Sequence, residues 1–547
     1  MTNSMDDIAN QSQIYFIIGS NTTENHPVLG MRVRQAVKQR GAKLILCDPR
    51  NIPIADFATL HIRQRPGTDI ALMNGIMNVL IAEDLYDKKF VAERTEKFEE
   101  LKAKVAEYTP ERAAKICEID PKDIVKAAHL LAENHPGALL YAMGITQHSM
   151  GHANVITTAN LQMLLGNMGV PGGGVNPLRG QSNVQGACDM GGLPNFFPAY
   201  QQVVNPDART KFEQAYGIAA GSLAAKPGLT VVEMMNAAHA GTLKALFVVG
   251  ENPMMTDPDI NHVREALNHL DFLVVQDIFL TETAQLADVV LPGASFVEKT
   301  GTFTNTERRV QLIRQAIPVI ADARADWMIL RDLAMRMLAM EPGRVSDAPF
   351  SGWHYTAPDQ IMAEIAALTP SYGGMRHERL GMKGLQWPCP NTEHPGTPIL
   401  HVGKFTRGLG QFVPMDHTPA AEMPSAEYPY ILTTGRILYH YHSGSLTRRS
   451  VGLNEHVPEG SVEVNPEDAA RLGIADGELA HVVSRRGEVF AKADVTDRVQ
   501  PGLVFMTFHF AEAAANLLTN PVLDPVSKIP EYKVCAVRLE KANGSGA

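Results

Sequence analysis

The chain has 547 residues, more than one hydrophobic core usually supports, so we expect two to four domains. Its composition, 45% hydrophobic and 20% charged, is typical of a globular protein and excludes a disordered one. A formal net charge of -10 without any basic stripe argues against nucleic-acid binding, and no apolar run approaches the roughly 20 residues that span a bilayer.

The five cysteines lie far apart and form no CxxC pair. This spacing excludes a disulfide framework and a thiolate metal cluster made by this chain alone. The first residues, MTNSMDDIANQS, are acidic and polar, unlike a secretory signal or a transit peptide. We therefore expect a cytoplasmic protein.

The first ordered pattern is a strand at residues 14–18, followed by Gly19, Ser20 and Asn21. A helix is predicted over 27–40 and a second strand over 43–47, which closes on Asp48 and Arg50. Strand, glycine turn, helix and strand in this order predict a parallel βαβ unit, whose ligands bind beyond the carboxyl ends of the strands. A turn leading to Asp69 then precedes a helix over 70–81, and a buried strand is predicted over 138–143, ending at Gly144.

A second unit of the same kind follows, with strands predicted at 243–249, 272–275 and 288–291. The sequences FIIGSN (16–21) and FVVGEN (247–252) are the same strand-to-turn element, which predicts two related α/β domains with two related ligand sites. The stretch 341–425 is irregular and rich in Pro and Gly. Short strands then alternate with turns at 430–434, 461–464, 479–484, 488–495 and 503–507, with one helix at 466–472, and they predict a compact β-barrel or sandwich.

The loops at the strand ends are the first candidate site. Asp48 and Asp277 can accept hydrogen bonds from a ribose or a guanine edge, and loop N–H groups can meet phosphates. Neither unit carries the GxGxxG turn, which disfavours a nicotinamide-dependent dehydrogenase. A single glycine after a strand is also common where it only forms a turn and binds no ligand.

The polar, glycine-rich loop at 175–198 shows no helical or strand periodicity, and we expect it to surround a ligand. Within this loop Arg179 is flanked by small or apolar residues, so we predict that its guanidinium is held in place. A fixed guanidinium offers a planar set of N–H donors that suits a small carboxylate. The alternative for any arginine is a solvated surface position.

Two further motifs each have more than one interpretation. His440 and His442 alternate as on a strand, and His148 and His152 are four apart, but neither pair has evident third and fourth ligands for zinc. We interpret the first pair as a hydrogen-bonding strand end that supports a polar ligand. Arg308 and its neighbour Arg309 either contact phosphates or belong to a solvated turn.

Several stretches together resemble the catalytic subunit of molybdenum- or tungsten-dependent formate dehydrogenases, in the superfamily that binds two molybdopterin guanine dinucleotides. They include IIGSNTTENHP, LCDPR, YAMGITQ, VGENP, GTFTNTERRVQ, TTGRILYHYHSGSLTRR and PEYKVCAVR, and they span nearly the whole chain. The stretch NPLRGQSNVQGACDMG is specific to formate dehydrogenases and close relatives.

The resemblance implies two pseudosymmetric Rossmann-like parallel-sheet domains, over 1–180 and 181–335, then a connecting segment over 336–425 and a double-psi-type β-barrel over 426–547. It also implies that Arg179 orients formate, with Gln181 beside it in the catalytic site. The positions that match cofactor-contact residues are Gly19, Ser20, Asn21, Asp48, Arg50, Asp69, Gly144, Gln147, Gly250, Asn252, Gln276 and Asp277, with Arg436, His440, Thr447, Asn516 and Lys533 in the barrel.

The implied activity is the oxidation of formate to carbon dioxide at a bis-molybdopterin guanine dinucleotide centre holding Mo or W, with electrons leaving through iron–sulfur clusters. The family also carries a four-cysteine domain for a [4Fe-4S] cluster and a Cys or selenocysteine metal ligand followed by His, and neither occurs in this sequence. We therefore expect the chain to be the C-terminal portion of a longer enzyme, through a selenocysteine codon read as a stop or through a split gene.

Three functions stay open from the sequence. The first is a formate dehydrogenase catalytic subunit, working with an iron–sulfur subunit and an NAD-linked, hydrogenase or membrane-anchored partner. The second is a cofactor-binding scaffold that needs a separate N-terminal chain. The third is a related molybdopterin oxidoreductase with another substrate, and Arg179 and Gln181 are the residues that discriminate it from the first.

Overall fold

The computed structural model describes residues 1–341, 343 and 345–542 of the chain, which form two compact units. The first unit contains Met1–Gly180, Pro253–Val263 and the described residues from Ile399 onward. The second contains Gln181–Asn252 and Arg264–Pro398. The four-part division expected from the sequence, at 1–180, 181–335, 336–425 and 426–547, stays a prediction.

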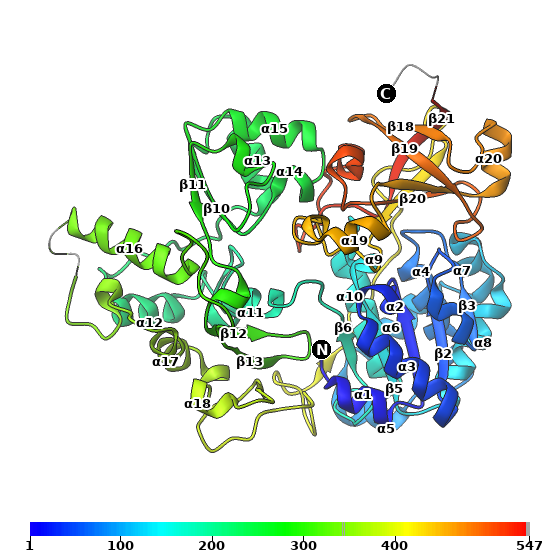
Figure 1. The fold of residues 1–547 in the computed structure, drawn as a ribbon. Helices are drawn as coiled ribbons and strands as arrows, with labels where there is room; N and C mark the ends of the chain where they lie inside the picture. The colour runs from blue at the N-terminus through cyan, green and yellow to red at the C-terminus, as the bar shows by residue number, and fades with distance from the viewer. Residues whose placement is uncertain (342, 344, 543–547) are drawn as a thin grey trace. The chain divides into compact units, whose positions relative to one another are not determined.

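The first unit is built on a five-stranded parallel sheet with the strand order β3-β2-β1-β5-β6 (Figure 1). The predicted strands at 14–18 and 43–47 and the predicted helix at 27–40 are confirmed residue for residue. The strand predicted at 138–143 ends earlier, because residue 143 already begins a short helix. The strands are β1 (Ile14–Ile18), β2 (Lys43–Cys47), β3 (Leu60–Ile62), β5 (Gly137–Tyr141) and β6 (Val175–Pro177).

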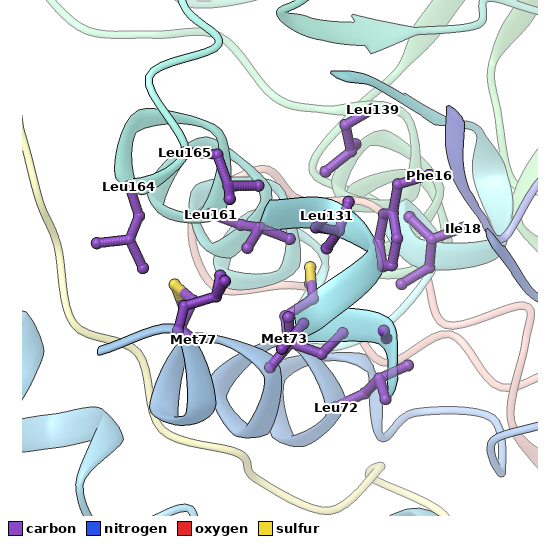
Figure 2. Packing of buried hydrophobic residues seen from close by; sticks show 14 of the residues in the cluster. Phe16, Ile18, Leu72, Met73, Met77, Leu131, Leu139, Leu161, Leu164 and Leu165 are labelled. Atoms are coloured by element: carbon purple, nitrogen blue, oxygen red, sulfur yellow. The ribbon is translucent and has the colours of Figure 1, made fainter. Parts of the chain in front are cut away.

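Helices cover both faces of this sheet, and the sequence of β1 shows why. Ile14, Phe16 and Ile18 join one buried cluster, while Tyr15 and Ile17 join another on the opposite face. Figure 2 shows Phe16 and Ile18 in the first cluster, together with leucine and methionine side chains of the covering helices. A strand buried on both faces is apolar throughout rather than alternating, as the run IYFII is.

The longest helices of the first cluster are α4 (Asp69–Ala82), α8 (Pro121–Glu133) and α10 (Gly151–Leu164), and those of the second are α1 (Met5–Gln11) and α3 (Pro27–Arg40). Shorter elements are α2 (Thr22–Asn25), α5 (Lys88–Arg94), α6 (Phe98–Val105), α7 (Pro110–Cys117) and α9 (Met143–Thr146). Within the described part of the chain, none of the helices is long and apolar enough to cross a membrane.

The loop expected at 175–198 contains more regular structure than its sequence indicates. Its first residues form β6, which pairs in parallel with β5, and a later stretch forms helix α11 (Val184–Asp189). The expectation of an irregular loop was therefore wrong at these two places, and also at the two-residue strand β7 (Phe196–Phe197). Three residues of strand and six of helix are too short for periodicity to show in a sequence.

The second unit contains a three-stranded parallel sheet with the order β11-β10-β9. Its strands are β9 (Ala245–Val249), β10 (Phe272–Asp277) and β11 (Val289–Pro292), which confirms the three predicted strands with shifts of one or two residues at their ends. After β9 the N–H of Gly250 donates to the carbonyl of Gln276 at the end of β10 (2.8 Å). After β1 the N–H of Gly19 donates in the same way to Cys47 at the end of β2 (3.0 Å), so the repeated sequence element forms the same turn twice.

An antiparallel sheet, β12-β13-β14, and several helices complete the second unit. The stretch 341–425, expected to be irregular, contains an eleven-residue helix, α17, so that expectation was wrong there. These elements are β12 (Gly301–Thr304), β13 (Arg309–Ile313), β14 (Leu385–Gln386), α12 (Pro206–Tyr216), α13 (Val231–His239), α16 (Asp326–Ala339), α17 (Pro358–Leu368) and α18 (His377–Leu380).

The predicted C-terminal barrel belongs to the first unit and is a closed barrel with the order β16-β20-β17-β19-β18-β21. Two of its strand pairs are parallel, β16 with β20 and β17 with β19, and the others are antiparallel. The strand β21 was not predicted, yet it pairs with both β16 and β18 and closes the barrel. The elements are β16 (Tyr430–Gly435), β17 (Ser461–Val464), α20 (Pro466–Leu472), β18 (Leu479–Val483), β19 (Glu488–Val495), β20 (Leu503–Thr507) and β21 (Cys535–Lys541).

Candidate functional site

A cavity of the first unit lies at the carboxyl ends of β1, β2 and β5, next to the barrel. The chain reverses its strand order between β1 and β5, and ligands of open α/β sheets bind at such a point. The cavity is lined by ten of the residues expected to contact a cofactor, namely Gly19, Ser20, Asn21, Asp48, Arg50, Asp69, Gly144, Gln147, Arg436 and Lys533. The structure thus brings together residues that are far apart in the sequence, while their contact with a cofactor stays a prediction.

Two glycines let the ends of β1 and β5 approach each other. Gly19 has a positive φ of 57°, and its carbonyl accepts a hydrogen bond from the N–H of Gly144 (3.0 Å). A Cβ on Gly144 would lie 2.5 Å from the Cα and carbonyl oxygen of Gly19. Both neighbours are backbone atoms, which cannot move aside as a flexible side chain can. Residue 144 must therefore be glycine.

Gly144→Ala is therefore expected to destabilise the first unit, by about 2 kcal/mol or more, because overpacking a fixed contact costs this much. The measurement is the midpoint of thermal unfolding. Gly452→Ala is the matched control, because a Cβ at Gly452 would meet no atom within 4 Å. Equal midpoints for the two variants would contradict the close approach of the two strand ends.

Two buried carboxylates lie on the sheet side of the cavity. Asp48 is 9% exposed and Asp69 is 4% exposed. Asp48 accepts a hydrogen bond from the N–H of Arg50 (3.0 Å), and Asp69 accepts one from the Nε2 of Gln64 (3.1 Å). Burial raises the pKa of each carboxyl from 3.8 to about 6, so both are charged at neutral pH, and both are available as acceptors for a ligand.

Asp69→Asn is expected to change how stability depends on pH in the ligand-free chain. The folded carboxyl has the higher pKa, so between about pH 3.8 and 6 the folded chain binds more protons than the unfolded one. Stability then falls as pH rises through this window, by about 3 kcal/mol for a shift of this size. Asp69→Asn should lose this part of the decrease in stability. Its unfolding midpoint at pH 8 should therefore be higher than that of the wild type.

The measurement for Asp69→Asn is the thermal unfolding midpoint between pH 4 and pH 8, with exposed Asp207→Asn as the control. Asp48 titrates in the same window, so part of the slope should remain in the variant. An unchanged slope in Asp69→Asn would show that this carboxyl is not buried as a charged group.

Arg50 joins the cavity to the barrel. Its Nε and Nη2 donate to the two carboxylate oxygens of Glu463 on β17 (3.0 and 2.6 Å), and its guanidinium stacks on the ring of Phe505 on β20, 3.5 Å from the ring centroid. Both sides of the ion pair are buried, 9% and 6% exposed. Arg50, which is expected to contact a cofactor, therefore also connects the sheet side of the cavity to the barrel side.

Lys533 and Arg436 line the barrel side of the cavity. The Nζ of Lys533 donates to the carbonyl of Thr434 (2.6 Å), and burial, together with the nearby Arg436, lowers the pKa of Lys533 from 10.5 to about 7. Burial also lowers the pKa of Arg436. Cations on this side and carboxylates on the opposite side give the cavity donors and acceptors for a polar ligand.

Arg179 lies two residues after β6, on the same unit. Its carbonyl accepts a hydrogen bond from the Nε2 of His26 (2.6 Å). Its guanidinium acts electrostatically on Tyr141, the last residue of β5, whose pKa burial raises to about 12. Gln181 is exposed and begins the second unit, so the proposed pairing of these two residues stays a prediction.

The three other barrel residues are buried or fixed away from the cavity lining. His440 donates from Nε2 to the carbonyl of Val457 (2.7 Å), and its Nδ1 lies 3.2 Å from the hydroxyl oxygen of Thr447. The Nδ2 of Asn516 donates to the carbonyl of Met255 (2.8 Å). The histidines at 440 and 442 do not lie on a strand as interpreted from the sequence, because β16 ends at residue 435.

The four residues expected to bind the second dinucleotide lie in the second unit. Gly250 follows β9 with a φ of 65°. Asn252 donates to Glu282 (2.7 Å) and accepts from the hydroxyl of Thr283 (2.7 Å). Gln276 donates to Asp326 (2.8 Å), and the Oδ1 of Asp277 accepts from the N–H of Ile278 (2.6 Å).

Arg308 is not on a solvated turn. It is 2% exposed, and its guanidinium donates to the carbonyls of Trp387, Thr397 and Pro398. Burial lowers its pKa to about 10. The solvated turn was therefore wrong for this arginine, which holds the connection between β13 and the stretch after β14, and contact with a phosphate stays a prediction.

Sequence reasoning missed several residues of the cavity. Gln64 lies in a coil between β3 and α4, and Thr433, Thr434 and Phe505 lie on barrel strands. The two threonines precede Gly435 at the end of β16, the same strand-to-glycine signal that identified Gly19. Gln64 and Phe505 carry no such signal. No group of three or more His, Cys, Asp or Glu side chains that could hold a metal ion occurs among the residues that the structure describes.

A Rossmann-like sheet with a polar cavity at its switch point defines a protein that binds a nucleotide-bearing cofactor. The molybdopterin oxidoreductase family model matches residues 1–336, and the molydopterin dinucleotide binding domain matches residues 430–536. The chain therefore belongs to the molybdopterin oxidoreductase family.

Its relatives include formate dehydrogenases of archaea and bacteria. The alpha subunit of F420-dependent formate dehydrogenase 1 of Methanococcus maripaludis is 49% identical over 544 residues, covering 99% of this chain and 78% of the relative. Formate dehydrogenase H of Escherichia coli is 40% identical over 546 residues, covering 99% of this chain and 74% of the relative. Among solved structures, acetylene hydratase from Pelobacter acetylenicus has the same fold, with a TM-score of 0.74, 22% identity, and coverage of 98% of this chain and 78% of that one.

Proposed function

We propose that this chain is a formate dehydrogenase catalytic subunit, which oxidises formate to carbon dioxide at a bis-molybdopterin guanine dinucleotide centre holding Mo or W. Membership of the molybdopterin oxidoreductase family supports the cofactor, and the formate dehydrogenase relatives support the substrate. The observation that carries the proposal is the position of Arg179, whose carbonyl bonds to His26 and whose neighbour Gly180 lies against the cavity residues His442 and Arg436.

The surroundings of Arg179 suit an anion. Arg436 lies close to both His26 and His442, and it lowers the pKa of each. His26 holds the backbone of Arg179 beside these groups, and a guanidinium fork matches the two oxygens of a carboxylate.

The cavity residues fit a guanine dinucleotide. Among the described residues, Ser20 Oγ, Asn21 Nδ2 and Gln64 Oε1 are buried cavity atoms that have no hydrogen-bond partner. Such atoms cost free energy unless a ligand meets them. We propose that Asp48 and Asp69 accept from the guanine or ribose donors of the first dinucleotide, and that Lys533 neutralises phosphate charge.

We propose the same role in the second unit for Gly250, Asn252, Gln276 and Asp277. The Oε1 of Gln276 is buried without a partner among the residues that the structure describes, as Gln64 Oε1 is in the first unit. In the barrel, His440, Thr447 and Asn516 are proposed to keep their loops in the shape that the cofactor needs, because their own hydrogen bonds are made within the protein.

In the proposed reaction HCOO⁻ gives CO₂, one proton and two electrons. The bound metal centre supplies the oxidant for cleavage of the C–H bond. Arg179 binds the carboxylate, and with Gln181 it orients the C–H bond away from the guanidinium. Because the product is uncharged, it loses the attraction of Arg179 and leaves.

We further propose that the electrons leave through a [4Fe-4S] cluster to an iron–sulfur subunit of an NAD-linked, hydrogenase, membrane-anchored or F420-linked complex. A cytoplasmic location is proposed because none of the five cysteines, all within the described residues, forms a disulfide, as expected in a reducing compartment.

The test is to isolate the complex that contains this chain from its natural source and to measure its metal, guanine nucleotide and formate-dependent viologen reduction. The proposal expects one Mo or W and two guanine nucleotides for each chain, together with formate oxidation. A complex with full cofactor content that reduces no dye with formate, yet turns over another substrate, would contradict it. Coupled assays with NAD, F420 and protons then identify the acceptor.

A further inference from the structure

Two histidines hold the backbone of Arg179 and Gly180 from two elements. His26 is the N-cap residue of α3, and its ring nitrogen lies 2.6 Å from the carbonyl oxygen of Arg179. His442 lies in the loop after β16 and contacts Gly180. All of these residues belong to the first unit.

The hydrogen bond of His26 determines its protonation. A carbonyl oxygen only accepts, so Nε2 carries the proton and donates it. Within the described part of the chain, its Nδ1 is buried and has no partner. Burial lowers the pKa of His26 to about 4, with Arg436 adding to the effect, so the ring is neutral at physiological pH.

His442 is neutral for a second reason. The Nη1 of Arg436 lies 2.9 Å from His442 Nε2, and a guanidinium only donates, so this ring nitrogen must be an acceptor. Burial and Arg436 lower the pKa of His442 to about 4. The loop carbonyl of His442 in turn accepts from the Nδ1 of His509, whose Nε2 accepts from the N–H of Ile437 (3.2 Å).

Gly180 lies directly on the ring of His442. A Cβ at this position would be 2.5 Å from His442 Cε1 and 3.0 Å from Arg436 Nη1. The peptide next to Arg179 is thus confined by an imidazole on one side, while a hydrogen bond from His26 fixes its carbonyl. Such contacts restrict the direction in which the Arg179 side chain leaves the backbone.

We propose that His26 and His442 are positioning residues for Arg179, which in their neutral forms fix the Arg179-Gly180 peptide so that the guanidinium meets the carboxylate of formate. This inference rests on the proposed function. A guanidinium displaced by about 1 Å can cost on the order of 10²-fold in rate, so the precision of this support matters for turnover.

The test uses the cofactor-loaded complex and pairs each disruptive variant with a conservative one. His26→Leu removes the donor and His26→Gln keeps one. His442→Phe keeps a ring without the acceptor for Arg436, and His442→Gln keeps an acceptor. His417→Gln is the control, since this half-buried histidine contacts Tyr108 and not the Arg179 loop.

His26→Leu and His442→Phe are expected to lower kcat/KM for formate by about tenfold or more, chiefly through KM, and the two Gln variants should stay within about threefold of the wild type. Metal and guanine nucleotide content should not change. Hydrogen exchange of the segment 178–183 should become about tenfold faster in the two disruptive variants only.

Unchanged KM values in His26→Leu and His442→Phe would overturn the proposal, as would equal losses in the Gln variants. Loss of cofactor from both disruptive variants would also overturn it, because the histidines would then serve cofactor retention. If the wild type does not oxidise formate, the proposed function fails, while hydrogen exchange still decides whether the two histidines hold the Arg179 segment.

Discussion

Arg179→Ala is expected to lower kcat/KM for formate by at least about 10²-fold, because a charge-assisted pair of hydrogen bonds to the carboxylate is lost together with substrate orientation. The backbone of residue 179 should stay in place, since His26 bonds to its carbonyl and not to its side chain. Guanine nucleotide and metal content should therefore equal those of the wild type.

Arg179→Lys separates charge from geometry. A lysine keeps the positive charge but cannot offer two parallel N–H groups in one plane, so most of the loss should persist. Arg32→Ala is the control, because this arginine pairs with Asp6 at the surface. Wild-type kinetics in Arg179→Ala with full cofactor content would remove Arg179 from the substrate site.

Glu463→Ala is expected to destabilise the first unit by about 3 kcal/mol or more, because it leaves the buried guanidinium of Arg50 without its carboxylate. The two guanidinium nitrogens that donate to Glu463 would lose their acceptors while the group remains stacked on Phe505. Cofactor retention should fall as well, since this pair fixes the barrel to the sheet beside the cavity.

The measurement is the unfolding midpoint, with nucleotide content after gel filtration as a second readout. Glu459→Ala is the matched control in the same barrel, because its partner Lys492 and Glu459 itself are both more than half exposed. Exposed pairs contribute about 0 to 1 kcal/mol. Equal effects of the two substitutions would show that the Arg50 pair is solvated.

The sheet of the first unit could be predicted because its signals are local. The runs at 14–18 and 43–47 are apolar throughout, as strands covered on both faces are, and glycine or aspartate follows each one. The candidate residues Gly19 and Asp48 then followed from the rule that ligands bind at the carboxyl ends of parallel strands, and Gly144 followed from the family resemblance.

The remaining part of the site depends on contacts that no local pattern encodes. Arg50 and Glu463 are 413 positions apart, so their pairing has no signature in either segment. The local sequence around Arg308 is compatible with a solvated or a buried side chain. Arg308 is buried because carbonyls of a later segment accept hydrogen bonds from its guanidinium. Gln64 belongs to a coil without periodicity. Resemblance to a family identified Lys533, which periodicity alone would have left as an ordinary lysine.

The first unit is assembled from three separate stretches of chain, and this has a consequence for its biosynthesis. The residues on the sheet side of the cavity are synthesised early, whereas Glu463, Thr434 and Lys533 emerge from the ribosome only after the whole second unit. Contacts over such sequence distances form slowly. The cavity is therefore complete only after residue 533 has been synthesised, so a cofactor that fills it must enter a polypeptide whose sheet and second unit have already emerged.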